Sequence, residues 1–203
     1  DLPPDYYAMT LARRAGADNI VDQNIGQFIV SPAKSLAHPV TMSKAFSLKN
    51  IFLFHYMLAY QYSQVGQSAK ARAAYDRALA LNPAFVDKIP EYAGFLIKEK
   101  QYADAAAMIE RIKTEEKLRF QYALLKGQAL AGLERYDEAI LSLQEGNRIY
   151  NSDAGLLATL GNCYYKIGDN ARALEALQAS FKLNMEQTAV KALIDEIERK
   201  KKD

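Results

Sequence analysis

The stretch Ala158–Leu177, ATLGNCYYKIGDNARALEAL, decides the fold because its small and large residues recur at a fixed spacing elsewhere in the chain. Ala173 is the last of four alanines that lie 34 residues apart. Three further series keep that spacing: Ala59, Ala93, Gly127 and Gly161; Tyr62, Leu96, Leu130 and Tyr164; and Tyr75, Ile109, Leu143 and Leu177. A period without insertions indicates one structural unit repeated along the chain.

The period divides the chain into four copies, 52–85, 86–119, 120–153 and 154–187. Within each copy, apolar residues recur at steps of three and four and are interrupted once by a short polar break, which predicts two antiparallel helices joined by a turn. Three of the four breaks carry a glycine suited to a helix end. Small residues fit where two helix axes approach closely, so we expect the series that ends at Gly161 to mark that contact.

These residues resemble the tetratricopeptide repeat, and the resemblance covers about two thirds of the chain. The first copy carries Leu58, Ala59, Tyr62, Gly66, Ala71, Tyr75, Ala78 and Pro83, and the fourth carries Leu157, Leu160, Gly161, Tyr164, Gly168, Ala173, Leu177 and Ser180. The resemblance implies an all-α, right-handed α-solenoid of four helix–turn–helix repeats, because one helix pair cannot bury its own apolar face. Some positions depart from the family pattern: Lys117, Asn151 and Met185 replace the proline, and Lys126 and Ile112 replace a leucine and an alanine.

The two ends of the chain fall outside the period. Residues 188–203 continue as an amphipathic helix, and Asp195 stands where a fifth repeat needs a small residue, so we expect a C-terminal capping helix. Residues 1–31 alternate as a β-hairpin or extended segment and resemble the closing strands of an immunoglobulin-like sandwich. Residues 32–51 are interpreted as a linker with a helical lead-in. The chain begins with Asp1, which we interpret as a processed or excised piece of a longer protein.

Catalytic and cofactor chemistry find no support in the residue pattern. The net charge of +2 is too small to predict a nucleic-acid partner, and the longest apolar run is too short to span a bilayer. His38 and His55 belong to no metal-ligand motif, and the glycines follow the repeat rather than a phosphate loop. Cys163 has no histidine nearby and is interpreted as a small packed thiol. We therefore expect no metal, no cofactor and no enzyme activity.

The resemblance instead implies a partner that binds along a concave face lined by the first helix of each repeat. The residues that the register assigns to this groove are Leu53, Tyr56, Met57, Tyr60, Gln64, Ile97, Lys98, Leu124, Gln128, Asn162 and Tyr165. Tyr56, Met57 and Tyr60 are expected as anchors because aromatic and Met side chains bury large areas at interfaces. One subgroup of the family clamps a peptide carboxylate with cations, but the matching positions here include Glu91 and Leu125, which disfavours that ligand.

Two functions remain open at this point. The first is a non-catalytic scaffold that binds a protein or peptide segment, which includes the chain's own N-terminal segment or another copy. The second is an accessory or regulatory region of a larger multidomain enzyme or cell-envelope protein. The sandwich-like N-terminus favours a bacterial extracytoplasmic protein, with a cytoplasmic one as the alternative.

Overall fold

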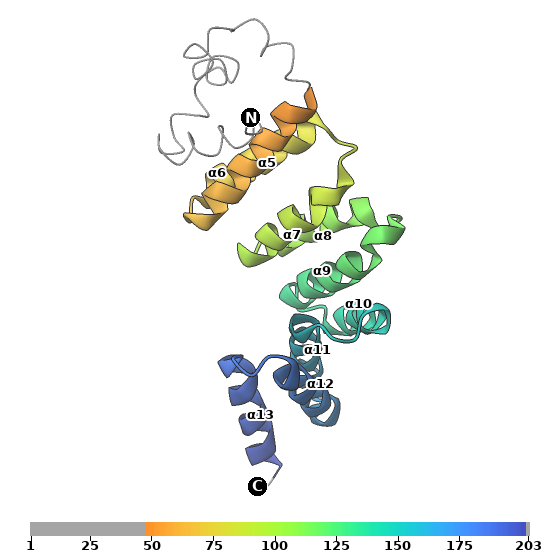
Figure 1. Cartoon of the computed structure of the whole chain (residues 1–203). Helices are drawn as coiled ribbons and strands as arrows, with labels where there is room; N and C mark the ends of the chain where they lie inside the picture. The colour runs from red at the N-terminus through yellow and green to blue at the C-terminus, as the bar shows by residue number, and fades with distance from the viewer. Residues whose placement is uncertain (1–47, 202–203) are drawn as a thin grey trace, which may run out of the picture. The chain divides into compact units, whose positions relative to one another are not determined.

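The computed structural model of the chain describes residues 48–201. The expected N-terminal hairpin and most of the linker lie outside the described residues. The described part divides after Phe85 into two compact units, which are considered separately below. Within residues 48–201 the regular structure is entirely helical (Figure 1). None of the described helices combines the length and the apolar character that crossing a bilayer requires.

The first unit contains one helix hairpin, α5 (Leu48–Gln64) followed by α6 (Ser68–Leu81). Its two helices approach closely because Ala59 and Ala71, which are fully buried, face the contact. The aromatic residues fill the space beside this contact: the rings of Tyr56 and Tyr75 meet edge to face with centroids 5.3 Å apart. These are the two helices predicted for the repeat 52–85.

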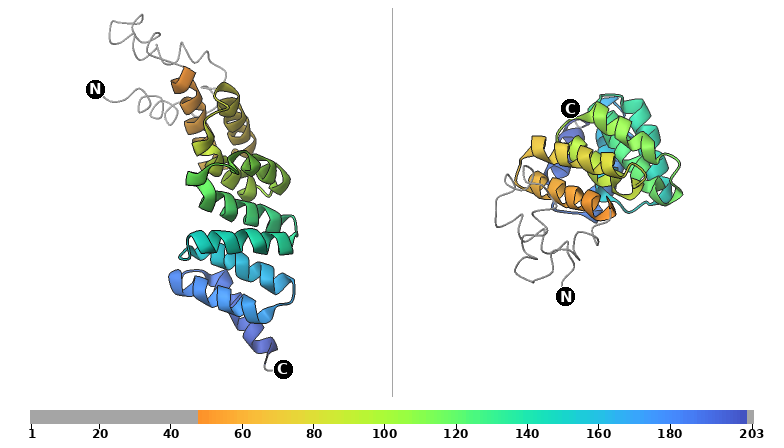
Figure 2. Two further views of the ribbon diagram at one scale, coloured as in Figure 1. Left: turned by 90° about the vertical axis from the view of Figure 1, so that its right-hand side faces the viewer. Right: turned by 90° about the horizontal axis from the view of Figure 1, so that it is seen from above.

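The second unit stacks three further hairpins and one single helix. The helices are α7 (Ile89–Lys98), α8 (Tyr102–Ile109), α9 (Arg119–Gly132), α10 (Tyr136–Ile149), α11 (Ala154–Lys166), α12 (Asn170–Leu183) and α13 (Thr188–Lys200). Each first helix contacts its own second helix, and each second helix contacts the helix that follows it (Figure 2). The first helices α7, α9 and α11 also contact one another in sequence. This is the packing expected of a repeat solenoid.

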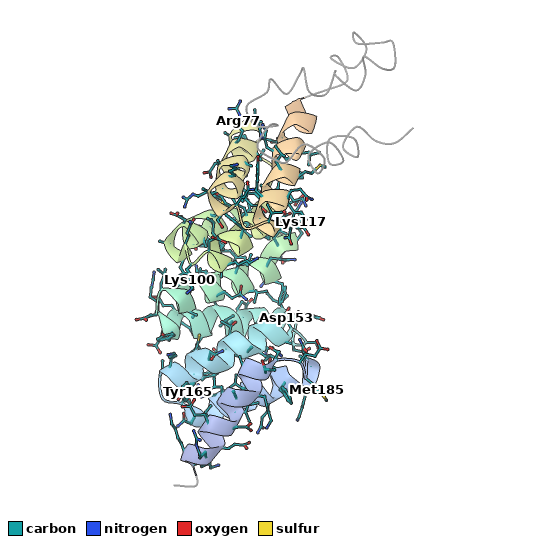
Figure 3. The ribbon with its side chains drawn as sticks, turned by 90° about the vertical axis from the view of Figure 1, so that its left-hand side faces the viewer. Arg77, Lys100, Lys117, Asp153, Tyr165 and Met185 are labelled. Atoms are coloured by element: carbon teal, nitrogen blue, oxygen red, sulfur yellow. The ribbon has the colours of Figure 1, made fainter. Side chains whose placement is uncertain are left out.

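The connections of the second unit alternate between two edges. Figure 3 places Lys117, Asp153 and Met185 on one side of the stack, where one hairpin leads to the next helix. Lys100 and Tyr165 lie on the opposite side, near the turns within the hairpins. The start of α11 is set by Asp153, whose carboxylate accepts a hydrogen bond of 2.7 Å from the backbone N–H of Leu156.

The close approach predicted at the small residues is confirmed. A Cβ atom on Gly161 would lie 2.6 Å from Cγ of Leu177 and 3.2 Å from the backbone oxygen of Ala173. Gly127 is in the same position relative to Leu143, one repeat earlier. The two helices of each of these hairpins therefore pack with no room for a side chain at this position.

The turns within the hairpins share one backbone feature that the sequence shows only in part. The fifteenth residue of each 34-residue repeat has a positive φ, whether or not it is glycine. These residues are Gly66 (74°), Lys100 (59°), Glu134 (61°) and Gly168 (86°). In the third repeat the glycine expected to end the helix, Gly132, has another role, because a Cβ there would overlap the ring of Tyr102. Glu134 takes the left-handed conformation instead, at a cost of about 1 kcal/mol.

The second repeat departs from the others in its second helix. α6, α10 and α12 each have 14 residues, whereas α8 has 8 and continues as the 3₁₀ helix η3 (Glu110–Ile112). Ile112 is fully buried at the position that Ala78, Gly146 and Ser180 occupy in the other repeats. Because its side chain is larger than theirs, the regular helix cannot continue through this contact unchanged. The loop then passes through η4 (Glu116–Leu118) into α9.

The last helix covers the end of the array. Val190, Ile194 and Ile197 of α13 are buried, and α13 packs against α12. Asp195 lies on the exposed side and forms an ion pair with Lys191, one turn earlier. The polar outer side and the buried inner side of α13 are those expected of a capping helix.

Because Gly161 lies at a close contact and Gly94 does not, substitutions at these two glycines of first helices are expected to have opposite effects on the free energy of unfolding. Gly161→Val is expected to lower the free energy of unfolding by about 1–3 kcal/mol, because the added carbons overlap Leu177. Gly94→Val is the matched control, because a Cβ there meets no atom within 4 Å. Since valine also favours helix over glycine, though less than alanine does, this variant is expected to raise the free energy of unfolding by about 0.5 kcal/mol. Urea denaturation followed by circular dichroism measures both, and equal effects would contradict the close approach.

Candidate partner-binding surface

The predicted groove residues of the second unit lie on consecutive first helices. Ile97, Leu124, Gln128 and Tyr165 are half-buried, while Lys98 and Asn162 are exposed. We call this set, together with Gly94, the first-helix face. It runs from α7 through α9 to α11, which contact one another in that order.

The middle of the first-helix face is uncharged. Gly94, Gln128 and Asn162 occupy equivalent positions in α7, α9 and α11. Gly94 has no side chain there, and the other two residues have side-chain amides. The side-chain amide of Asn162 donates a hydrogen bond of 3.0 Å to the backbone oxygen of Ala158 in the preceding turn. A side-chain amide has two N–H donors and an accepting oxygen, so Asn162 keeps further hydrogen-bonding capacity. Such a surface suits the backbone of a polypeptide.

Lys98 is the one charged residue of the first-helix face as defined, and four further charged residues lie beside it near the start of α7. The carboxylate of Glu91 accepts a hydrogen bond of 3.1 Å from Nζ of Lys88, which partly offsets its charge. At the next inter-repeat loop, Lys117 pairs with Asp87 at 2.6 Å. These pairs lie at the start of α7. From Gly94 to Asn162, the first-helix face contains no acidic residue.

The C-terminal end of the face is closed by the capping helix. The hydroxyl of Tyr165 donates a hydrogen bond of 2.8 Å to the carboxylate of Glu196. The same hydroxyl accepts a hydrogen bond of 2.8 Å from Nζ of Lys200. Hydrogen bonds from Lys200 and Tyr165 hold the pKa of the Glu196 carboxyl below its usual range. The sequence register assigns Tyr165 to the face but gives no sign of this contact, because Glu196 and Lys200 lie beyond the last repeat.

The predicted groove residues of the first unit divide into two kinds. Leu53 and Met57 are half-buried, and Tyr60 and Gln64 are exposed, so these four remain accessible on α5. Tyr56 is buried, with 3% of its surface exposed, because its ring packs within the hairpin.

The burial of Tyr56 changes how its role is interpreted. Its ring meets those of Phe52 and Tyr75 edge to face, so Tyr56 stabilises the hairpin instead of presenting its ring to solvent. Of the three residues expected as anchors, Tyr60 is the most exposed, with 48% of its surface accessible. A test of partner binding in this unit therefore changes Tyr60 alone.

Cys163 and His55, the two residues of the described part considered above for chemistry, are both buried. No group of three or more His, Cys, Asp or Glu residues within residues 48–201 is placed to hold a metal ion. Cys163 of α11 is buried in the hydrophobic core of the second unit, and burial raises the pKa of its thiol to about 11. His55 is buried in the first unit, where desolvation and then the positive charge of Arg77 lower its pKa to about 4. His38 lies outside the described residues.

The chain contains tetratricopeptide repeats. Family models of the tetratricopeptide repeat match residues 52–85 and 154–185, which correspond to the first and the last of the four repeats read from the sequence. No curated protein matches the chain in sequence.

Several solved structures share the fold. The structure of MamA AMB-1 is 15% identical with a TM-score of 0.63, and the match covers 91% of this chain and 99% of that one. PilF of Pseudomonas aeruginosa is 21% identical with a TM-score of 0.64, over 74% of this chain and 69% of that one. The type III secretion chaperone SycD of Yersinia enterocolitica, in complex with a peptide of the translocator YopD, is 19% identical with a TM-score of 0.51, over 57% and 93%. At these identities the likeness concerns the fold alone.

The buried thiol predicts low reactivity in the folded chain. At about pH 8 a thiol with a raised pKa holds little thiolate, so iodoacetamide is expected to modify native Cys163 at least ~100-fold more slowly than the urea-unfolded chain. Mass spectrometry of the single cysteine follows the reaction. Equal rates in the folded and unfolded chain would show that Cys163 is accessible.

The neutral state of His55 predicts a loss of stability in mild acid. Because its pKa is about 4 in the fold and 6.5 in the unfolded chain, the unfolded state binds more protons between these values. The free energy of unfolding of the first hairpin is therefore expected to fall by about 2 kcal/mol from pH ~7.5 to pH ~5. Urea denaturation of the chain at both pH values measures this change.

His55→Leu is the matched control, because Leu157 occupies the equivalent position in the fourth repeat. The variant is expected to lose most of this pH dependence. A pH slope that is the same in both proteins would show that His55 is not the titrating group.

Proposed function

We propose that this chain is a non-catalytic interaction module that holds a segment of a partner protein against the first helices of its repeats. The observation that carries the proposal is the first-helix face, where partly exposed residues follow one another on three helices in contact. A tetratricopeptide repeat fold supports a role in protein interaction, and stacked repeats provide extended binding surfaces of this kind.

The chemistry of the face favours a polypeptide over a charged ligand. Gln128 and Asn162 can hydrogen-bond to the backbone of a bound segment, and Leu124 and Ile97 offer partly exposed apolar contacts beside them. Gly94 adds a position without a side chain, where a Cβ atom would have no neighbour within 4 Å, so the bound chain can approach the backbone of α7 there. An internal segment suits this surface better than a terminal carboxylate, because no pair of cations stands at its centre.

The comparison with SycD supports a peptide ligand, since that protein has a similar fold and its structure contains a peptide of YopD. For this chain the identity of the partner remains a proposal at the level of class: a segment of another protein, another copy, or residues 1–47 of the chain itself. The role as an accessory region of a larger protein is compatible with the same surface, since the module then recruits a partner to the rest of that protein.

Site-specific crosslinking tests the proposal on the full chain in the cells that produce it. A photoreactive amino acid at Asn162 on the first-helix face is expected to crosslink to a defined segment, which mass spectrometry identifies. The same group at Glu175, which is exposed on α12 in the same repeat, is the control and is expected to give no such product. Equal products at both positions, or none at either, would contradict the proposal.

The captured segment then allows the affinity to be measured. Gln128→Ala is expected to weaken its binding about five- to tenfold, the loss of one or two hydrogen bonds. Gln178→Ala removes the same amide from the exposed side of α12 and is expected to leave the affinity unchanged. Isothermal titration of both variants decides between these outcomes.

A further inference from the structure

A second concave site lies on the other side of α9, within the second unit. A hollow of about 400 Å³ is bounded by the loop after η3, by α9 and by α10. Tyr122 and Lys126 of α9 line it, whereas Leu124 and Gln128 belong to the first-helix face. Because positions two apart on a helix are turned by about 200°, the two sites face opposite ways. The volume is at the lower end of the range for ligand pockets.

The hollow is where the chain departs from its own repeat. Lys126 occupies the position that is leucine at Leu58 and Leu160, so a long cation replaces a residue of the core. The large side chain of Ile112 coincides with the early end of α8, and Lys113 in the following loop forms part of the rim. Places where a sequence breaks its local rule are expected to be functional or strained.

The wall formed by α10 has an apolar part, Leu141 and Ile149, beside the polar Ser142 and Glu145, and the Glu145 carboxylate is paired with Arg119 and Arg148. Leu141 and Ile149 line the hollow with 67% and 39% of their surfaces exposed. Other residues at the outer surface of α10 are polar, and a leucine so exposed contributes little to the fold. This wall offers the area needed to cover one side chain of the size of leucine.

The opposite wall carries positive charge. Nζ of Lys126 lies 2.9 Å from Oε1 of Glu110 and 5.0 Å from the centroid of the Tyr122 ring. Lys113 approaches the same carboxylate only to 3.9 Å, and its side chain is 64% exposed. Two lysines therefore share one glutamate at the rim, and Lys113 is the more loosely held of the two.

The remaining ion pairs leave this charge uncompensated. Arg119 bridges Glu116 at 2.9 Å and Glu145 at 3.0 Å, and Arg148 also binds Glu145, at 2.8 Å. With the separate group of Lys113, Lys126 and Glu110, these ion pairs contain four cations and three carboxylates, a balance of plus one. Glu138, whose charge also acts on Lys126, is itself paired with Arg135 and leaves this balance unchanged. One more carboxylate would neutralise it.

We propose that this hollow binds an acidic–apolar segment of a partner protein, in which a Glu or Asp stands next to a residue of the size of leucine. The carboxylate binds between Lys113 and Lys126, and the apolar side chain packs on Leu141 and Ile149. The Tyr122 hydroxyl donates a hydrogen bond of 3.1 Å to Glu110 and accepts one of 2.8 Å from Nζ of Lys126, so it fixes the position of this lysine beside the hollow. This site is separate from the first-helix face and can be occupied at the same time.

The combination of walls selects a peptide over simpler ligands. A free anion would meet the lysines but leave the apolar wall exposed, and a purely apolar side chain would leave the charge unbalanced. A peptide of two residues matches both walls and the volume of the hollow. With one partly exposed ion pair and one apolar contact, the isolated peptide is expected to bind weakly, in the millimolar range.

Nuclear magnetic resonance of the ¹⁵N-labelled full chain tests the site. The probe is the peptide acetyl-Gly-Glu-Leu-Gly-amide, which is expected to shift the amide signals around Tyr122, Lys126 and Leu141 in a saturable way. Two matched peptides carry Gln for Glu or Gly for Leu, and each is expected to bind about five- to tenfold more weakly. Equal shifts with the Gln peptide, or with inorganic phosphate alone, would overturn the proposal, as would no shift at millimolar peptide.

Two variants separate this site from the fold and from the first-helix face. Lys126→Leu introduces the residue that the first and fourth repeats have at this position, so the chain is expected to stay folded while peptide binding falls at least ~fivefold. Leu141→Ser changes an exposed side chain and is expected to weaken binding similarly without altering the melting temperature. Gln128→Ala, on the opposite side of α9, is expected to leave this binding unchanged. Binding that persists in both Lys126→Leu and Leu141→Ser would refute the proposal.

Discussion

The contact between two helices at a position without room for a side chain underlies the described structure. Where Gly161 faces Leu177 and Gly127 faces Leu143, the helices of a hairpin lie so close that the large residues on either side can fill the remaining space. The equivalent residues of the first two repeats, Ala59 and Ala93, are also small and fully buried, so a small residue recurs at this contact every 34 residues and the hairpins have a similar shape. The first-helix face follows from this regularity, because it brings equivalent positions of α7, α9 and α11 into one row.

The regular part of the fold could be predicted from the sequence because the period fixes both the helices and their contacts. The positions of the hairpins, the close approach at Gly161 and the covering helix α13 were all readable from residue spacing. The length of α8 could not be predicted from residue spacing, because the large side chain of Ile112 changes the helix only through its packing against other elements. Spacing placed the turn of the third repeat correctly between Gly132 and Tyr136, but the residue with positive φ there is Glu134 and not the glycine.

The candidate surface was predictable to a smaller extent. Register predicts which residues belong to a first helix and which side they share, and the predicted residues from Ile97 to Asn162 are half-buried or exposed. It cannot show burial that depends on partners elsewhere, as for Tyr56 against Tyr75, or contacts beyond the repeats, as for Tyr165 with Glu196. The hollow beside Lys126 was visible in the sequence only as a departure from the pattern, since its shape depends on the early end of α8.

The shortness of α8 also has a consequence for local opening within the second unit. In a repeat array each element is held mainly by its neighbours, and local opening costs least where the regular helix is short. α8 has eight residues and ends in a 3₁₀ turn, so fewer backbone amides there are protected by i to i+4 hydrogen bonds than in α10 or α12. Cooperativity along the stack is therefore weakest at α8. The hairpins of α9–α12 can stay intact while this helix exchanges its amide hydrogens with solvent.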